Sequence, residues 1–372
     1  MNGQWTGTYG GTNSGRITLD IDDRRSCFSG IASVSSDIVG LPQVSIAFQT
    51  ANKSGIFQFH AENVAVYDPS TGDLVSWEKI KGKFPENVMV PKAVDVSGEW
   101  NDTSLRLSWQ TDFGTSGNCI LPKSRADQPS DLRALKTDWG EFKRAVSGLT
   151  NRRDLFRGQS DRWRLRTTFH RSGRADLLRF LNQDIPTLYR HLSARTRHKF
   201  NLKDPDENGS FFNLLQHHGY PTPLLDWSYS PYVAAFFAYR DVSRAEEVRP
   251  DPDRCVRIFI LDERWRTEVN QKLFAAGPFP HFSIAEFIAI DNERMIPQQS
   301  VSAITNTDDI ESYLAEMAIK VGKGEPHLAA IDLPVSQRSL VFADLAHMGV
   351  TAGSLFPGLD GTCEELKERH FR

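Results

Sequence analysis

The sequence predicts a multidomain protein in which an all-β antiparallel barrel or sandwich, residues 1–122, precedes an α+β domain, residues 130–372. In the first part, short runs such as residues 17–21 alternate apolar and polar side chains, and glycine or asparagine separates the runs. In the second part, apolar residues recur at helical steps between short strand-like runs. The polar residues 123–129 are expected to form a linker.

The composition is ordinary for a soluble globular protein. A chain of 372 residues is long enough for two hydrophobic cores, and 39% of its residues are hydrophobic and 24% charged. The net charge of −3 gives no overall attraction to nucleic acid. No apolar run reaches membrane length and no secretory leader is recognisable, so we expect a cytoplasmic protein without a membrane partner.

The four cysteines are widely spaced. Cys27, Cys119, Cys255 and Cys363 form neither a CxxC pair nor a zinc-binding spacing. The chain also lacks the paired acidic motifs and zinc-binding helix that mark many metal enzymes. We therefore expect free thiols and no metal cofactor.

Tryptophans mark the beginning and the end of the first part. Residues 3–9 read GQWTGTY and place Trp5 near the start, whereas Trp100 and Trp109 come late. This pattern resembles small lipocalin-like or avidin-like barrels, in which an early tryptophan closes one end. The resemblance implies a sensing part that takes a small ligand or a protein trigger. The alternative is that the aromatic side chains simply fill the interior.

Periodic runs outline the elements expected in the second part. A helix capped by Ser130 would extend to Leu149 with one apolar stripe, and a short strand would cover residues 154–159. Further helices are expected at 177–192 and 307–321, after Ser336, and after a capping box of Thr362 with Glu365, and further strands at 256–261, 287–290 and 328–333.

Residues 210–239 combine a helix, a rigid turn and a second helix start. Ser210 is expected to cap the first helix and Gly219 to end it, before a turn stiffened by proline. Ser230 followed by Pro231 then begins the second helix. A helix N-terminus leaves backbone N–H groups unpaired and attracts anions, so this corner is expected to bind phosphate.

Several motifs carry a resemblance to a known family. Residues 156–159 read FRGQ and residues 216–228 read QHHGYPTPLLDWS, ahead of AFFA at 235–238 and LFPGLDG at 355–361. These motifs resemble the FRG domain and cover most of residues 130–370. Pro223 departs from the family pattern. The resemblance implies a bacterial or phage-linked accessory protein, with antiviral defence as its expected setting.

The order of these motifs is similar to that of Arg-Ser-Glu ADP-ribosyltransferases. An aromatic-Arg-Gly strand at 156–158 and the sequence WSYS at 227–230 correspond to the first two elements. Glu286 or Gln298 would be the third, which acts on a ribose of the substrate. The likeness implies an ADP-ribosyltransferase-like fold that uses NAD as its substrate.

The same likeness assigns roles to five earlier residues. Arg157, with Gly158 and Gln159, would grip the diphosphate of NAD, because a guanidinium can form two parallel hydrogen bonds with phosphate. Ser228 and Ser230, with the helix start that follows them, would position the nicotinamide ribose.

Two further candidates come from the residues themselves. His217 and His218 lie at a helix end, where the helix dipole also favours a structural histidine, and one of the two is expected to face the site. Asp226 lies between Leu225 and Trp227, and a carboxylate among apolar neighbours must find donors or shift its pKa. Asp226 either takes part in the chemistry or braces the turn.

The leading hypothesis is an ADP-ribosyltransferase-like or NAD-cleaving effector, a toxin of a defence system, whose N-terminal barrel senses a trigger. A second hypothesis is a non-catalytic nucleotide- or nucleic-acid-binding FRG module that contacts phosphates through the arginine-rich window 152–174. A nuclease is disfavoured, because the sequence lacks an acidic metal cluster.

Overall fold

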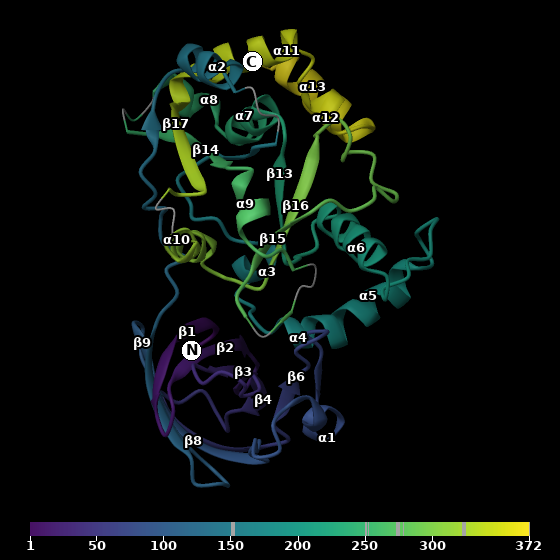
Figure 1. Cartoon of the computed structure of the whole chain (residues 1–372). Helices are drawn as coiled ribbons and strands as arrows, with labels where there is room; N and C mark the ends of the chain where they lie inside the picture. Colours follow the sequence, from purple (N-terminus) through teal and green to yellow (C-terminus); the bar gives the residue numbers. More distant parts are fainter. Residues whose placement is uncertain are drawn as a thin grey trace.

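The computed structural model of the protein describes residues 1–149, 153–249, 251, 253–272, 276–277, 279–321 and 325–371. The chain forms a curled β-sheet, at the bottom of Figure 1, and a mixed α/β body above it. The N-terminus lies in the first of these and the C-terminus in the second (Figure 1).

Ten antiparallel strands form the first sheet, in the order β5-β8-β9-β10-β1-β2-β3-β4-β6-β7. Along β2, buried and half-buried side chains alternate, because successive residues of a strand point to opposite faces. The strands are β1 (Gly3–Gly11), β2 (Gly15–Asp23), β3 (Phe28–Ser36), β4 (Val44–Gln49), β5 (Ile56–Glu62), β6 (Ala65–Tyr67), β7 (Leu74–Ser76), β8 (Ala93–Trp100), β9 (Ser104–Thr111) and β10 (Ser116–Pro122).

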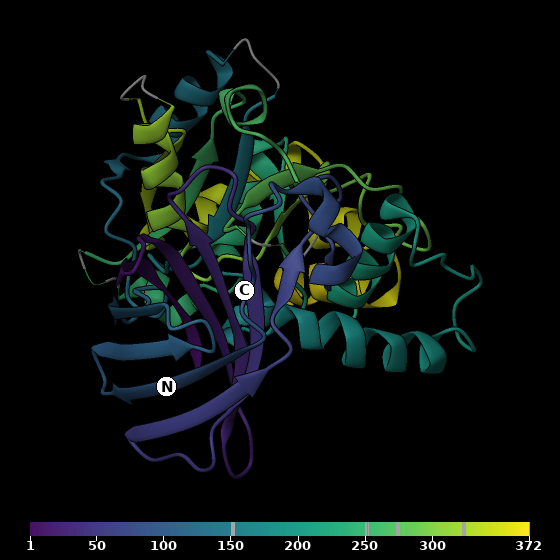
Figure 2. The same cartoon turned by 60° about the horizontal axis from the view of Figure 1, so that its bottom comes forward.

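The first sheet curls into a half-barrel (Figure 2). Strands β4 and β5 follow one another in the chain but do not pair, since β5 pairs with β8 while β4 pairs with β3 and β6. The concave face packs an apolar core that includes Trp5 and Leu105. Helix α1 (Trp77–Ile80) and the turn η1 (Lys81–Lys83) follow β7. The barrel alternative is therefore confirmed in an open form.

Seven strands form the second sheet, in the order β11-β17-β14-β12-β13-β16-β15. Strand β11 pairs in parallel with β17, and the other pairs are antiparallel. The strand expected at 287–290 is wrong, since a strand forms at 282–285 instead. The strands are β11 (Leu135–Lys136), β12 (Leu155–Gln159), β13 (Leu224–Ser228), β14 (Cys255–Leu261), β15 (Phe282–Ala285), β16 (Ser300–Thr305) and β17 (Leu328–Pro334).

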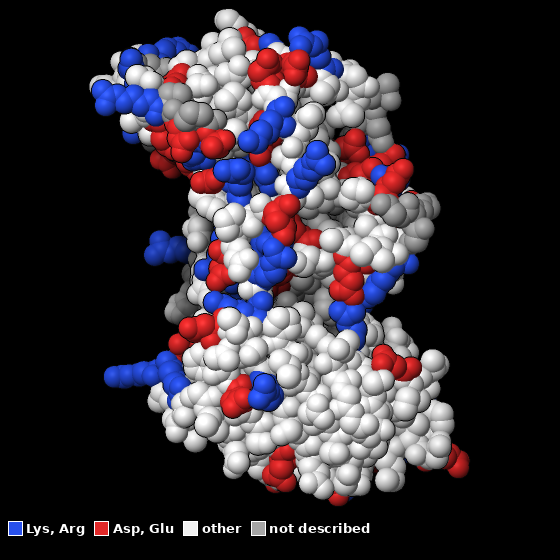
Figure 3. Space-filling view, turned by 90° about the vertical axis from the view of Figure 1, so that its left-hand side faces the viewer, with Lys and Arg blue, Asp and Glu red and all other residues white. Residues whose placement is uncertain are grey.

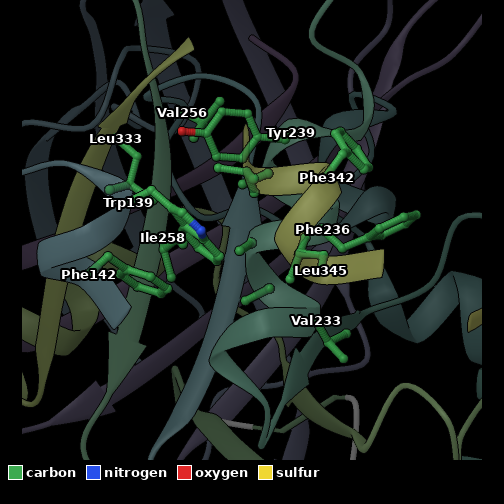
Figure 4. Close-up of a cluster of buried hydrophobic side chains, with 14 of the residues drawn as sticks. Trp139, Phe142, Val233, Phe236, Tyr239, Val256, Ile258, Leu333, Phe342 and Leu345 are labelled. Carbon is green, nitrogen blue, oxygen red and sulfur yellow. The ribbon is translucent and has the colours of Figure 1, made fainter. Parts of the chain in front are cut away.

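Helices cover both faces of the second sheet. On one face, α2 (Trp139–Ser147), α7 (Pro231–Arg240) and α11 (Arg338–His347) enclose the apolar cluster of Figure 4. On the other, α9 (Arg264–Glu268) and α10 (Ile310–Lys320) pack a second cluster. Both faces of the strands are consequently apolar, unlike those of the half-barrel. The remaining helical segments are α3 (Thr168–Arg171), α4 (Leu177–Arg179), η2 (Phe180–Asp184), α5 (Ile185–Leu192), α6 (Pro205–His217), α8 (Arg244–Val248), η3 (Val335–Gln337), α12 (Ala352–Leu355) and α13 (Leu359–His370).

Three helix starts differ from those expected from the sequence. Asp138 caps α2, whereas Ser130 lies outside the helix and its hydroxyl donates to Glu311 over 2.7 Å. Asp204 caps α6 by accepting two backbone N–H groups, so Ser210 lies inside that helix. Thr362 likewise lies inside α13. Aspartate and serine are both good caps, and tertiary contacts decided between them.

A buried network of ions joins the half-barrel to the α/β body. The carboxylate of Asp22, on β2, is almost fully buried and accepts hydrogen bonds from the side chains of Arg174 and Arg179, each over 3.0 Å. It also accepts the backbone N–H groups of residues 175 and 176. Arg16, on the same strand, pairs with Glu316 of α10. Strand β2 therefore faces the half-barrel interior on one side and the α/β body on the other.

His170 should make the folded protein sensitive to mild acid. Its imidazole is fully buried, and desolvation lowers its pKa from the ordinary 6.5 to about 4. As the pH falls below 6.5, His170 becomes protonated in the unfolded chain but stays neutral in the folded chain. The free energy of unfolding therefore decreases between pH 6.5 and about pH 4. At pH 5 the expected loss is about 2 kcal/mol.

Denaturant titrations at pH 7 and pH 5 would measure this loss. The variant His170→Gln cannot titrate, so its free energy of unfolding should fall by about 2 kcal/mol less than that of the unmodified chain. Equal losses in the two proteins would contradict the assignment.

All four cysteines are free thiols, as their spacing predicts. Cys27, Cys119 and Cys255 are buried and Cys363 is exposed. Burial raises the pKa of the Cys119 thiol to about 11. Within the described ranges, every helix is too short or too polar to cross a lipid bilayer.

Candidate functional site

A cavity of about 360 Å³ opens between the second sheet and its helices. Strands β12 and β13, helices α6 and α7, and the segment 292–300 line it. Seven of the candidate residues from the sequence contribute to the lining, namely Arg157, Gly158, Gln159, His217, Asp226, Ser228 and Gln298. Ser230 and Glu286 do not contribute to it.

Arg157 and Asp226 meet because their strands are neighbours in the sheet. Phe156 of β12 lies opposite Ser228 of β13. Arg157 donates a hydrogen bond from Nη1 to the backbone carbonyl of Asp226 over 2.6 Å. Desolvation lowers the pKa of Arg157 to about 10, which leaves its guanidinium charged at neutral pH.

The Asp226 side chain has solvent-accessible area in the cavity. The protein around the cavity nevertheless displaces much of the water that would otherwise surround its carboxylate. Its pKa is raised, first by desolvation, against the opposing effects of the Arg157 charge and a hydrogen bond from Gln216. A shifted pKa is one of the two outcomes expected for this carboxylate. The carboxylate retains solvent-accessible area that a ligand can contact.

Three arginines make the cavity electropositive. Arg171 and Arg294 line it together with Arg157. None of the three forms an ion pair with any residue that the structure describes, although Arg294 stacks over the ring of Phe356 at 5.0 Å. The lining carboxylates are those of Asp226 and Asp241. The surplus of positive charge favours an anionic ligand.

Three residues that line the cavity have a buried donor without a hydrogen-bond partner among the described residues. The donors are Nε of Arg157, Nδ2 of Asn213 and Nε1 of Trp227. The Trp227 ring packs against Phe282 in the second apolar cluster. The Asn213 side chain is buried, and its Oδ1 accepts a hydrogen bond from Ser302 over 2.8 Å, which fixes the orientation of the amide. Buried polar groups rarely remain unpaired, so the N–H groups of Arg157 and Asn213 indicate where a ligand supplies acceptors.

His217 is neutral at physiological pH. Desolvation, followed by the charge of Arg294, lowers the pKa of its imidazole to about 4. The neutral ring can accept a proton. His218, whose ring centroid lies 5.0 Å away, is exposed and does not line the cavity. The expectation that one histidine of the pair faces the site is therefore met by His217.

The two serines build the helix start. The hydroxyl of Ser228 donates to the carbonyl of Gln298 over 2.7 Å and accepts the N–H of Ser230 over 3.0 Å. Ser230 caps α7 by accepting the N–H of Val233. Helix α7 lines the cavity with Val233, Ala234 and Phe237, whereas its capping residue Ser230 does not line it.

Gly158 and Gln159 have structural roles. A Cβ atom added to Gly158 would lie 1.9 Å from the carbonyl oxygen of Ala234, so glycine allows β12 to touch the backbone of α7. Gln159 is buried and donates from Nε2 to the carbonyl of Trp163 over 2.7 Å, which fixes the loop beyond the strand. The two residues after Arg157 in the FRGQ motif thus fix the strand against α7 and the loop beyond it.

The late candidates differ in position. Gln298 lines the cavity, and its Nε2 donates to the carbonyl of Leu355 over 2.9 Å. Glu286 instead accepts hydrogen bonds from Tyr229 and Arg266, and these contacts lower its pKa. The structure therefore places Glu286 outside the candidate site.

Three arginines of the arginine-rich window are held in ion pairs. Arg164 pairs with Asp131 and Asp309, Arg166 with Asp308, and Arg174 with Asp22 and Asp184. Arg152 lies outside the described residues. Arg157 and Arg171 are the members of the window that line the cavity.

Comparison with known families identifies part of this body. Residues 152–247 match the family model named FRG domain. The match contains Arg157, Asn213, His217 and Asp226, whereas Gln298 lies beyond it. No curated protein and no solved structure matched the chain.

Proposed function

We propose that the protein is an effector that binds NAD in this cavity and cleaves its nicotinamide–ribose bond. The observation that carries the proposal is that the Asp226 carboxylate lines the same cavity as three arginines that lack ion-pair partners among the described residues. The unpaired donors of Arg157 and Asn213 add two hydrogen bonds for a diphosphate or ribose. NAD suits a site with charges of both signs, because its diphosphate is negatively charged and its nicotinamide leaving group is positively charged.

The proposed reaction uses groups that are already present. The bond between ribose C1′ and the pyridinium nitrogen breaks, and its electron pair leaves with nicotinamide. Asp226 stabilises the positive charge that develops on the ribose. The oxygen of water or of an acceptor hydroxyl then forms a bond to C1′ and releases its proton to the neutral imidazole of His217.

Asp226 takes the role that the likeness to ADP-ribosyltransferases gave to a late glutamate. Three features support an ADP-ribosyltransferase-like arrangement: Arg157 is on one strand, Ser228 is on the next and precedes α7, and a later segment reaches the cavity through Gln298. Glu286 does not line the cavity and contacts Tyr229 and Arg266, which supports giving this role to Asp226. Defence is the proposed setting, with the half-barrel as the sensing part.

Free nicotinamide released from NAD by the full-length protein would test the proposal. Arg157→Ala should lower kcat/KM by about 100-fold, because a guanidinium makes charge-assisted hydrogen bonds of about 1.5–3 kcal/mol each. Arg144→Ala is the matched control, since Arg144 is exposed on α2 and has only a surface partner.

Titration of the protein with ADP-ribose by calorimetry gives a second readout. Binding that is weakened in Arg157→Ala, with no nicotinamide released by either protein, would instead support a non-catalytic nucleotide-binding module. Absence of both turnover and binding would overturn the assignment of this cavity.

A further inference from the structure

A second cavity, of about 290 Å³, lies against the concave face of the half-barrel. Side chains that point inward from a filled barrel are buried, but here Val34, Ile46, Phe59, Val96 and Trp109 line the cavity and are only half-buried. The aromatic residues therefore do not fill the interior. An unfilled apolar space in a folded protein is a candidate ligand site.

The residues at the cavity differ in exposure. Trp5 is 3% exposed, and its Nε1 donates over 2.7 Å to the backbone carbonyl of Met1, which lines the cavity. Met89 is 66% exposed and Phe113 is 44% exposed, and both also line the cavity. Large apolar side chains exposed in this way are usual at the mouth of a binding site.

The lining selects a neutral, ring-containing molecule. Among the residues that the structure describes, the lining contains no lysine, arginine, aspartate or glutamate side chain. Its aromatic rings form two groups, in which Tyr9 and Trp109 meet edge to face at 5.5 Å and Phe48 and Phe59 stack at 5.0 Å. A charged ligand would be desolvated here without a counter-ion, whereas a neutral ring finds aromatic contacts.

Polar groups occur in two pairs on the lining. The Asn13 amide lies 3.5 Å from the Ser36 hydroxyl, and the hydroxyls of Thr111 and Thr115 lie 2.6 Å apart. Each pair can hold one hydroxyl or carbonyl group of a ligand. The low charge extends to the outer surface, since the face of the half-barrel in Figure 3 carries far fewer charged side chains than the α/β body above it.

We propose that this cavity binds a neutral small molecule with one or two aromatic rings. A volume of about 290 Å³ is near the lower end of the range for pockets that take drug-sized ligands, about 300–1,000 Å³. The site is separate from the cavity beside Arg157, and the two linings share no residue.

The position of β2 connects the second cavity to the rest of the molecule. Ile17 and Leu19 line it from one face of the strand. Arg16 and Asp22, on the same strand, hold the α/β body through Glu316 and Arg174. A ligand that contacts Ile17 and Leu19 therefore lies against β2, the strand whose ion pairs connect the half-barrel to the α/β body.

The neutral probe N-phenyl-1-naphthylamine tests the site in the full-length protein. Its fluorescence should rise on saturable binding with one site per chain. Val96→Trp fills the cavity and should weaken binding at least tenfold. Gln110→Trp is the matched control, because Gln110 is exposed on the neighbouring strand and does not line the cavity, and it should bind the probe as the unmodified chain does.

Val34→Trp, on the opposite wall, repeats the test if Val96→Trp does not fold as judged by circular dichroism. Absence of saturable binding to the unmodified chain would overturn the proposal. Equal affinity in the filled variants and the control would also overturn it, because the probe would then be bound elsewhere. Neither result bears on NAD turnover, which is measured separately.

Discussion

Replacing Asp226 by asparagine should lower the rate of nicotinamide release by about a thousandfold, with little change in KM. Asparagine keeps the shape of the side chain but removes the negative charge that stabilises the positive charge developing on the ribose. Removing one preorganised electrostatic group from an active site lowers kcat by about 10²–10³. Initial rates over a range of NAD concentrations would separate kcat from KM.

Asp241→Asn is the control for this experiment. Asp241 also lines the cavity, but Asp226 is the carboxylate whose charge acts on Arg157. The control should keep most of the activity of the unmodified chain. A similar rate for Asp226→Asn and Asp241→Asn would contradict the role given to Asp226.

The pH profile gives an independent check on the same residue. Because desolvation raises the pKa of Asp226, its carboxylate becomes protonated at a higher pH than an ordinary aspartate. Turnover should therefore fall as the pH decreases through this raised pKa. That dependence should be absent from the residual activity of Asp226→Asn.

Replacing Gly158 by alanine should destabilise the fold by about 3 kcal/mol or more. The added methyl group would lie 1.9 Å from the carbonyl oxygen of Ala234 and 2.7 Å from the backbone nitrogen of Ala238. Both are backbone atoms of α7, so β12 and the helix must separate. Overpacking in a core typically costs about 1–3 kcal/mol, and more where the backbone is involved. Chemical denaturation would measure the change.

Gly82→Ala is the control for this second prediction. A Cβ atom at Gly82 meets no atom within 4 Å, and the backbone there does not have a positive φ. Its stability should equal or slightly exceed that of the unmodified chain. If Gly158→Ala were equally stable, the close approach of β12 and α7 would not be required by the fold.

The parts of the fold that were predicted correctly are encoded by neighbours in the sequence. Ser230 followed by Pro231 specifies a helix start, and Gly219 adopts the positive φ that ends α6. The alternation of apolar and polar residues in the first part of the chain correctly predicted strands there. The choice between Asp204 and Ser210 as a cap was not encoded in this way, since both residue types are good caps.

The sequence predicted the site residues that belong to local motifs. It did not predict the site residues that come from distant segments of the chain. Asn213 lies among four apolar residues of α6, and that pattern was a signal for a buried amide with a special role. Arg171 and Arg294 carry no such signal, because only the tertiary fold brings them to the cavity. Nor could the sequence show that Tyr229 and Arg266 hold Glu286 away from it.

The four donors around Asp22 have a consequence for any attempt to divide the molecule. A fragment that begins after the linker would present Arg174 and Arg179 to water where each now meets a buried carboxylate, and the half-barrel alone would leave that carboxylate without its donors. If the α/β body were fused to another protein, that protein would have to supply a carboxylate in place of Asp22. A protein fused to the half-barrel would have to supply two guanidinium groups in place of Arg174 and Arg179. The two halves are therefore expected to melt in a single cooperative transition.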